Sequence, residues 1–322
     1  MIKTSKEKIY YPIIDGHADT LVRITEENGS LGQYNERQHI DLPRLLEAGV
    51  DLQVMAICAA TKKNPYSWAK NIIFRWRAEY EALKEKLIWI RTGSDFANWE
   101  KGGKIGIILA MEGLEPLEGE LSRINEFFKL GVRMISLTWN KENQFASGVY
   151  AKKDLGLTAL GKQVVKTAED LGIILDLSHL GKGSFIDLLN IVREPVCVTH
   201  ANVFGVFPHI RNLDTEQIKM IASTGGTVGL TFYPPFINRN KVKCTDLIPH
   251  LEEVIKVAGE DCPALGSDFD GIEITPEDLR DVTGLPYFLN QLEDYGFNEG
   301  IINNFAGGNL YRLFKKKFSK RI

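Results

Sequence analysis

The sequence predicts a single (β/α)8 barrel that spans residues 1–322 and ends in helices. Three observations predict this fold: a length of 322 residues, eight short apolar runs, and helical spacing between those runs. Apolar residues make up 44% of the chain and charged residues 25%, which is typical of a globular protein. An open doubly wound sheet is the alternative fold, although no G-x-G-x-x-G motif follows the first run.

The eight apolar runs are interpreted as strands of a parallel sheet. Such strands are covered on both faces by other elements, so their sequences lack the strict alternation of apolar and polar residues. Several of the runs have this character. The runs cover residues 9–15, 50–59, 104–112, 133–139, 172–179, 195–200, 226–233 and 262–268.

The segments between these runs indicate helices. In residues 156–171 and 213–222, apolar residues recur at steps of three and four, as on the buried face of a helix. Asp214 or Thr215 is the predicted N-cap of the second segment. The basic sequence of residues 314–322 predicts positive charges in the last turns of a helix, where they oppose the negative end of the helix dipole.

Charge and hydropathy narrow the range of partners. The net charge of −3 gives no electrostatic reason to expect nucleic acid or an anionic membrane surface as a partner. No apolar segment approaches the roughly 20 residues that cross a bilayer, and no secretory signal follows the N-terminal lysines. We therefore expect a cytoplasmic protein that binds neither nucleic acid nor membrane.

The four cysteines predict a reducing environment. Cys58, Cys197, Cys244 and Cys262 form no C-x-x-C pair, which counts against a zinc ribbon or a thioredoxin-like site. Cys58 and Cys197 lie in apolar runs, so we predict that they pack as small hydrophobic side chains.

Polar side chains that can bind metal or move protons lie where five of the runs end. In a parallel barrel the carboxyl ends of the strands share one face, and that face carries the active site. Residues far apart in the sequence would therefore meet in one pocket. These residues are His17, Asp19, Glu112, His179, His200 and Asp268.

Five of these residues have the pattern of a two-metal centre. On an extended strand His17 and Asp19 point the same way, so both can hold one cation. His179 and His200 end consecutive strands, which lie about 4.8 Å apart in a sheet, so they can share a second cation. Glu112 can bridge, because a carboxylate offers one oxygen to each cation. These ligands suit Zn²⁺ best, with Mn²⁺, Co²⁺ and Fe²⁺ as alternatives.

Two further residues are candidates for catalysis and substrate binding. Asp268 can take a proton from a water molecule beside the metals and return it to a leaving amine. Asp270 and Gly271, which follow it, are interpreted as a turn. Arg211 has a planar fork that matches the C-terminal carboxylate of a short peptide, and the alternative is a surface arginine before a helix.

Together these motifs resemble the membrane (renal) dipeptidase family of metallopeptidases. They appear in the family's order and span most of the chain, so the set is far more specific than any one motif. The motifs are DGHAD at 15–19, MEG at 111–113, DLSH at 176–179, THANVFGV at 199–206, residues 211–237 and GSDFDG at 266–271.

The resemblance implies a barrel with two zinc ions. His17 and Asp19 match ligands of one zinc ion, His179 and His200 match ligands of the other, and Glu112 matches the bridging ligand. The resemblance also implies roles for three residues that are not metal ligands. Asp268 matches the acid/base, Arg211 matches the residue that binds the substrate carboxylate, and Tyr233 lies near a tyrosine of the family's pocket.

The sequence departs from the family at one position. Animal members carry the sequence LTH after the fourth strand, and its histidine is thought to polarise the scissile carbonyl. This chain has Trp139 at that position, followed by Asn140. Asn140, Asn143 or the zinc ion itself is the candidate to stabilise the oxyanion.

The resemblance predicts a binuclear zinc dipeptidase that takes small peptides, tolerates a D-residue at the C-terminal position and forms a homodimer. The alternative activity is hydrolysis of N-acyl amino acids, lactams or lactones at the same site. A metal-bound barrel without activity, with Trp139 marking lost catalysis, is the non-enzymatic alternative. His39, His209 and His250 have no predicted partner, and His209 is interpreted as structural.

Overall fold

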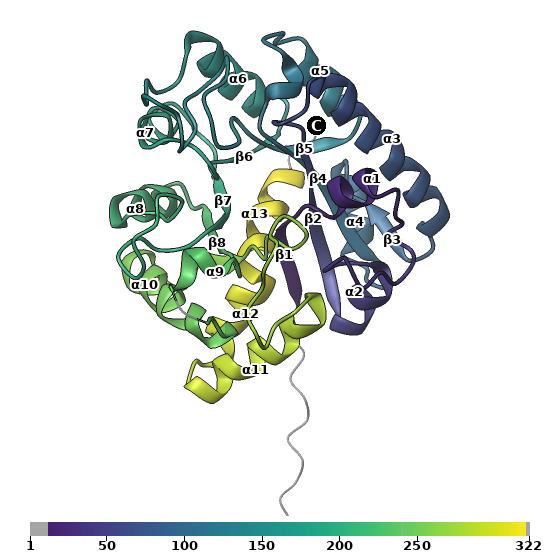
Figure 1. Ribbon diagram of the computed structural model, residues 1–322, viewed down its shortest axis with the longest axis vertical. Coiled ribbons are helices and arrows are strands. Elements are labelled where there is room, and N and C mark those ends of the chain that lie inside the picture. The colour runs from purple at the N-terminus through teal and green to yellow at the C-terminus, as the bar shows by residue number, and fades with distance from the viewer. Residues whose placement is uncertain (1–11, 240, 320–322) are drawn as a thin grey trace, which may run out of the picture.

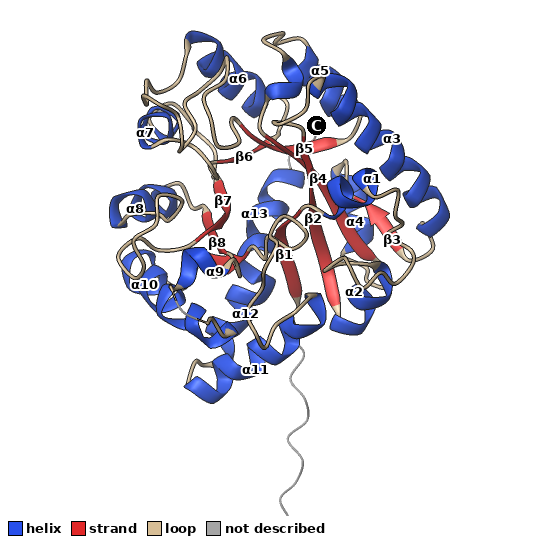
Figure 2. Cartoon of the chain, viewed as in Figure 1, coloured by secondary structure: helices blue, strands red, loops and turns tan. Residues whose placement is uncertain are grey.

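A closed barrel of parallel strands forms the centre of the molecule (Figures 1 and 2). The structure is a computed structural model and describes residues 12–239 and 241–319. The sheet closes because β2 pairs with both β1 and β4, while β3 pairs with the first residues of β4 outside the ring. The strands are β1 (Ile13–Ala18), β2 (Val50–Cys58), β3 (Leu87–Trp89), β4 (Ile105–Glu112), β5 (Val132–Ser136), β6 (Ile174–Asp176), β7 (Cys197–Ala201), β8 (Thr227–Leu230) and β9 (Pro263–Leu265).

The eight predicted runs correspond to the eight strands of the barrel, which confirms the predicted fold class. The sequence reasoning missed β3, which has three residues and is too short to carry a pattern. β1 continues to Ala18, three residues beyond the predicted run, and residues 9–11 of that run lie outside the described residues.

Helices surround the barrel in Figure 2. Among the described residues, no helix is long and apolar enough to cross a bilayer. The α-helices are α1 (Thr20–Glu26), α2 (Leu42–Ala48), α3 (Pro65–Leu83), α4 (Gly93–Trp99), α5 (Arg123–Lys129), α6 (Ala159–Asp170), α7 (Lys182–Leu189), α8 (Thr215–Ser223), α9 (Pro234–Ile237), α10 (Ile248–Ala258), α11 (Leu285–Tyr295), α12 (Glu299–Asn303) and α13 (Asn309–Phe318).

Three helix predictions are confirmed. The segment 156–171 contains α6, and the segment 213–222 contains most of α8. Asp214 is the N-cap of α8, and its side chain accepts a hydrogen bond from the backbone N–H of Gln217. Lysines occupy the last turn of α13, as the C-terminal charges predict, while residues 320–322 lie outside the described residues.

Apolar side chains fill the interior of the barrel at the end where the strands begin. Ile14, Leu52 and other strand residues pack there against Leu313 and Phe314 of α13. Asn309 at the start of this helix donates through Nδ2 to the carbonyl oxygen of Pro263 over 2.8 Å. α13 therefore forms a floor under the barrel, and the opposite face, at the carboxyl ends of the strands, is left for the site.

Two glycines allow three strands to pack closely beneath that site. A Cβ atom at Gly229 of β8 would lie 2.0 Å from the carbonyl oxygen of Thr199 in β7. A Cβ atom at Gly266, directly after β9, would lie 1.7 Å from the same oxygen. Only glycine fits at these two positions, so β7, β8 and β9 approach one another directly beneath His200 and Asp268.

His250 on α10 is buried as a neutral imidazole. Its Nδ1 accepts a hydrogen bond from the backbone N–H of Val203 over 3.0 Å, and its Nε2 lies 3.3 Å from the carbonyl oxygen of Ile237. Burial lowers the pKa of His250 to about 4. The histidine without a predicted partner thus connects α10 to the end of α9 and to the segment after β7.

We expect His250 to make the free energy of unfolding depend on pH. Between pH ~6.5 and ~4 the unfolded chain binds a proton at His250 that the folded chain does not, so stability falls as the pH is lowered through this window. The contribution is complete above pH ~6.5 and amounts to at most about 3 kcal/mol. Urea unfolding at a series of pH values should show a shallower decline for His250→Gln than for the parent. An equal decline in both proteins would contradict this prediction.

Candidate metal centre

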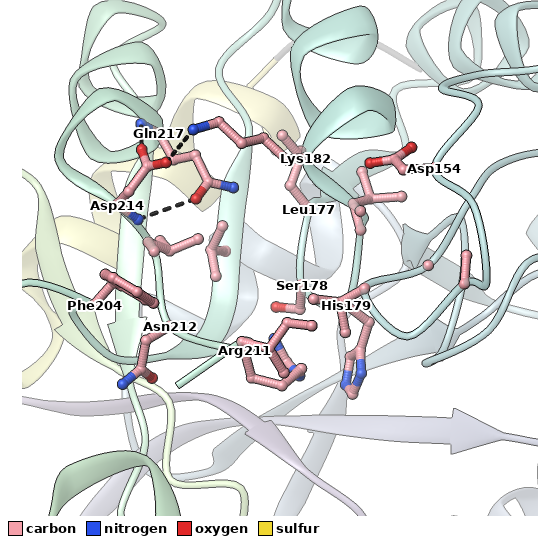
Figure 3. A pocket seen from close by; sticks show the side chains of 18 residues that line it. Asp154, Leu177, Ser178, His179, Lys182, Phe204, Arg211, Asn212, Asp214 and Gln217 are labelled. Atoms are coloured by element: carbon pink, nitrogen blue, oxygen red, sulfur yellow. Dashed lines mark hydrogen bonds and ion pairs between the residues drawn. The ribbon is translucent and has the colours of Figure 1, made fainter. Parts of the chain in front are cut away.

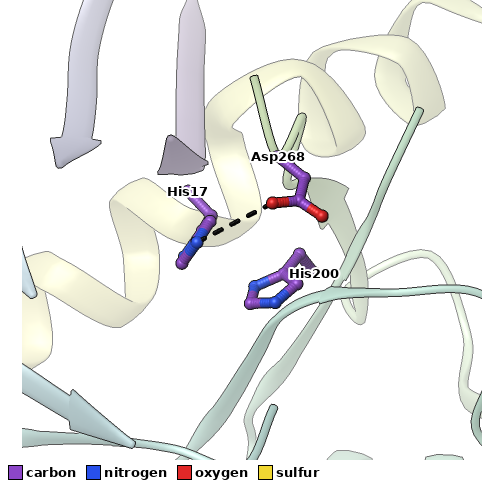
Figure 4. A group of neighbouring side chains, drawn as sticks. All are labelled: His17, His200 and Asp268. Carbon is purple, nitrogen blue, oxygen red and sulfur yellow. Dashed lines mark ion pairs between the residues drawn. The ribbon is translucent and has the colours of Figure 1, made fainter. Parts of the chain in front are cut away.

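Six side chains converge at the carboxyl ends of the barrel strands. They come from β1, the turn after it, the end of β4, the loops after β6 and β9, and from β7. They form three overlapping groups, and within each group one ligand atom per residue lies within 4.8 Å of the others. The groups are His17, Asp19 and Glu112; Glu112, His179 and His200; and His17, His200 and Asp268, the last shown in Figure 4.

Asp19 reaches the centre by a route that differs from the predicted one. It is not on an extended strand with His17, because β1 ends at Ala18 and Asp19 is the N-cap of α1, with φ −93° and ψ 17°. Its Oδ2 nevertheless lies 3.3 Å from Nε2 of His17. The backbone N–H of Asp19 donates to the carbonyl oxygen of Phe269 over 2.9 Å, which fixes the turn against the loop after β9.

Glu112 lies between the two histidine-containing groups. Its Oε1 is 2.9 Å from Nε2 of His179, 3.6 Å from Nε2 of His200 and 3.7 Å from Nε2 of His17. Glu112 is the last residue of β4, and its side chain is 6% exposed. The structure therefore brings together the residue predicted to bridge and the histidines predicted on either side of it.

The hydrogen bonds of two histidines leave their Nε2 lone pairs directed at the centre. Nδ1 of His179 lies 2.9 Å from Oδ1 of Asn140, which can only accept. Nδ1 of His200 lies 2.9 Å from Oγ1 of Thr199, whose hydroxyl donates to Asp176. Both Nδ1 atoms then carry the proton, and the two unprotonated Nε2 atoms face each other at 2.7 Å. Two lone pairs at this distance repel, and a cation between them would remove the repulsion.

His17 and the carboxylates around it also fit a bound cation. Nε2 of His17 is buried and makes no hydrogen bond, but three carboxylate oxygens lie 3.3 to 4.0 Å away from it. Burial raises the pKa of Glu112 to about 8 and that of Asp268 to about 7. Burial alone would lower the pKa of His17, but Glu112, Asp19 and Asp268 raise it to about 10. Buried carboxylates around one imidazole nitrogen form a donor set that suits a divalent cation such as Zn²⁺.

A cavity of about 450 Å³ opens above the six side chains. Its lining includes Trp139, Tyr150 and Cys58. The prediction that Cys58 packs as a small hydrophobic residue is wrong, because Cys58 is only partly buried and lines the cavity, next to Glu112 in the pairing of β2 with β4. The same prediction is confirmed for Cys197, which is fully buried inside the barrel. All four cysteines are free.

Arg211 lies in the wall of this cavity and is only 5% exposed. Its Nη2 donates to the carbonyl oxygen of His200 over 3.1 Å, and its guanidinium lies 5.5 Å from the ring centre of Phe236. The alternative of a surface arginine is therefore wrong. Arg211 and His179 also line a second cavity of about 320 Å³. The ion pair of Lys182 and Asp214 belongs to the lining of this second cavity (Figure 3).

Two further ring side chains line the main cavity near Arg211. Tyr233 precedes α9, and its ring centre lies 4.8 Å from that of Phe236. His209 accepts a hydrogen bond at Nδ1 from the backbone N–H of Arg211 over 3.2 Å, and its ring centre lies 4.4 Å from that of Phe236. His209 thus supports the arginine and also faces the cavity.

The two asparagines that are candidates to replace the missing histidine have different positions. Trp139 and Asn140 line the cavity, and Asn140 holds His179 as described above. Asn143 does not serve, because its Nδ2 donates to the carbonyl oxygen of Leu137 over 2.8 Å and to Oε1 of Glu115 over 3.1 Å. The amide of Asn143 braces the loop after β5 instead of facing the centre.

Sequence reasoning missed Asp270, which was interpreted as part of a turn. Its carboxylate is completely buried and bonds to Thr20 and to the backbone of His39. A second aspartate two residues after Asp268 is the signal in the sequence that could have drawn attention to it.

Comparison with known proteins connects this centre to a family. The chain matches the family model described as membrane dipeptidase (peptidase family M19) over residues 7–321. It is 31% identical over 235 residues to an uncharacterized protein of Klebsiella pneumoniae, which covers 70% of this chain and 86% of that protein.

Two solved structures are similar over nearly the whole chain. A dipeptidase described as a metallopeptidase of family M19 has a TM-score of 0.90 and 28% identity, over 97% of this chain and 99% of its own. A metallopeptidase from Rhodobacter sphaeroides, liganded with a phosphinate mimic of the dipeptide L-Ala-D-Ala, has a TM-score of 0.90 and 26% identity, over 96% of this chain and 100% of its own.

Proposed function

Since this chain belongs to the membrane dipeptidase family (peptidase family M19), we propose that it hydrolyses dipeptides at a centre of two zinc ions. Membership makes it a metallo-dipeptidase, a hydrolase of peptide bonds. In the proposal His17 and Asp19 hold one zinc ion, His179 and His200 hold the other, and Glu112 contacts both. The observation that carries the proposal is Oε1 of Glu112, which lies within 3.7 Å of Nε2 of all three histidines.

The chemistry divides between the metals and the chain. Zinc ions, when bound, supply Lewis acidity that lowers the pKa of a water molecule and polarises a carbonyl. Asp268 then acts as the acid/base: it accepts the proton of the attacking water and delivers it to the departing amine. Its Oδ1 lies 4.0 Å from Nε2 of His17, which supports this position beside the metals.

The wall of the cavity binds the substrate in this proposal. Arg211 presents its fork to the terminal carboxylate of the dipeptide, with Tyr233 beside it in the lining. Asn140 uses its Oδ1 for His179, so its contact with the substrate would come from Nδ2. The anchored carboxylate restricts cleavage to short peptides.

We also propose that the enzyme accepts a D-residue at the C-terminal position. The support is the Rhodobacter sphaeroides metallopeptidase, which is liganded with a mimic of L-Ala-D-Ala and resembles this chain over nearly its whole length. The cytoplasmic location and the homodimer stay predictions.

Metal removal tests the proposed function. We expect the purified protein to hydrolyse L-Ala-D-Ala, to lose this activity when a chelator removes its metal, and to recover it with about two equivalents of Zn²⁺ per chain. N-acetyl-D-alanine and a lactone in the same panel test the alternative substrates. Dipeptide hydrolysis that persists after complete metal removal, or activity confined to the other substrates, would contradict the proposal.

Replacing Arg211 with lysine should weaken substrate binding. Lysine keeps the positive charge and most of the buried stem but loses the planar fork, so we expect KM for L-Ala-D-Ala to rise roughly 10- to 100-fold while kcat changes little. The dipeptide amide, which lacks the terminal charge, is the control substrate. If Arg211→Lys raises KM for the dipeptide amide and for the free acid by the same factor, Arg211 does not bind the terminal carboxylate.

A further inference from the structure

The loop after β9 carries a second buried carboxylate, Asp270, in addition to Asp268. We infer that Asp270 is a positioning residue that fixes the spacing of the carboxylates of Asp19 and Asp268. It acts through a set of contacts that we call the Asp270 clamp, formed by Thr20, His39, Ile40 and Asp270. The inference deepens the proposed function and rests on it, because the two spaced carboxylates are a proposed zinc ligand and the proposed acid/base.

Every oxygen of the Asp270 carboxylate is used by the clamp. Oδ2 accepts from the hydroxyl of Thr20 over 2.6 Å and from the backbone N–H of Ile40 over 3.3 Å. Oδ1 accepts from the backbone N–H of His39 over 2.6 Å. The side chain is 0% exposed. Asp270 is therefore committed to internal donors and is not available as a metal ligand.

The clamp is reciprocal, because His39 also bonds to Asp270. The backbone N–H of Asp270 donates to Nδ1 of His39 over 2.9 Å, so this nitrogen is unprotonated. Burial lowers the pKa of His39 to about 4, with further lowering by the charges of Arg23 and Arg44, which is consistent with a neutral ring.

A buried ion pair holds the segment that contains His39. Nη2 of Arg44 lies 2.7 Å from Oδ2 of Asp41, and its Nη1 lies 3.0 Å from Oδ2 of Asp281. Asp41 also caps α2 by accepting from the backbone N–H of Arg44. The clamp therefore connects the loop after β9 to a segment that is itself anchored.

Backbone geometry shows why the loop needs this support. Asp268 and Asp270 both have a backbone φ of 65°, a left-handed conformation that residues other than glycine seldom adopt. Such a conformation persists when the surroundings hold it. The hydrogen bonds of Asp270, which lies two residues after Asp268, keep the loop in this conformation.

Gly271 connects the clamp to the two carboxylates. A Cβ atom at Gly271 would lie 2.2 Å from Oδ2 of Asp19 and 2.7 Å from Oδ1 of Asp268. The backbone directly after Asp270 therefore lies against both side chains. A shift of Asp270 would move this backbone and change the gap between the two carboxylates.

Asp270→Asn is the first test of the clamp. Asparagine has the same shape, but its NH2 group faces a donor and breaks at least one of the three contacts. We expect zinc affinity at the weaker of the two sites to fall about 10- to 100-fold, and kcat to fall by a similar factor with KM for L-Ala-D-Ala unchanged. Competition between the metal-free protein and a chromogenic chelator for Zn²⁺ measures the affinity without relying on activity.

Thr20→Val and Thr20→Ser form the second test, which stands even if Asp270→Asn does not fold. Valine removes the hydroxyl that donates to Asp270, whereas serine keeps it. We expect Thr20→Val to reproduce the loss of zinc affinity and kcat in weaker form, and Thr20→Ser to restore both toward the parent values.

Asp278→Asn is the matched control, because the partly buried carboxylate of Asp278 accepts a hydrogen bond from the backbone N–H of Cys244 over 2.7 Å and makes no described contact with the clamp or with Arg44. This variant should keep the zinc affinity and kcat of the parent. Parent values in both Asp270→Asn and Thr20→Val, or an equal loss in Asp278→Asn, would overturn the inference. A parent protein that binds zinc but cleaves no dipeptide would refute the proposed function instead, and the zinc titrations would still decide the role of the clamp.

Discussion

Glu112→Gln should lower kcat/KM for L-Ala-D-Ala by about 10³-fold or more. Glutamine keeps the shape of the side chain but removes the negative charge from the point where three Nε2 atoms approach Oε1. Two cations held close together would then repel without an anion between them. We expect the zinc content, measured by elemental analysis, to fall from two equivalents per chain to one or fewer.

Glu115→Gln is the control for this result. Glu115 is a partly buried carboxylate three residues further along the chain, and its Oε1 accepts from Asn143 rather than from a histidine. The control should retain two equivalents of zinc and most of the activity. If Glu112→Gln kept both zinc ions and normal kcat, Glu112 would not be the shared ligand.

Asp268→Asn should lower kcat by about 10²- to 10⁴-fold, the usual contribution of a general acid or base. In contrast to Glu112→Gln, we expect this variant to keep two equivalents of zinc and a nearly unchanged KM. Asparagine can occupy the same space but cannot accept a proton from water and pass it to an amine.

Elemental analysis distinguishes two roles for Asp268. Its oxygens lie close enough to His17 and His200 for all three to hold a cation together. If zinc is lost along with activity in Asp268→Asn, this residue is a ligand and the proton must be carried by another group. If zinc remains, the acid/base role stands.

Much of the fold follows from local sequence patterns. The eight buried strands appear as apolar runs because both faces of each strand pack against other elements. β3 escapes prediction because it has only three residues. The floor formed by α13 was also not predicted, because it depends on packing between Phe314 and strands far away in the sequence.

The candidate site shows where local reasoning stops. The strand ends predict which side chains meet. Asp19, however, does not share an extended strand with His17 as predicted, because it is the N-cap of α1. The positions of Cys58 and Asp270 at the site depend on residues far away in the sequence. Cys58 is paired with Glu112 on the neighbouring strand, 54 positions away, and Asp270 bonds to Thr20, 250 positions away.

The floor formed by α13 closes the end of the barrel opposite the proposed metal centre. Phe314 and Leu313 close the base of the barrel, so in the proposed function the dipeptide enters and both product amino acids leave on the side of the cavity above the centre. If Arg211 binds the terminal carboxylate as proposed, the product that keeps this carboxylate occupies the place where the next substrate docks. Accumulating product should therefore compete with substrate, and the rate of product release sets an upper limit on turnover.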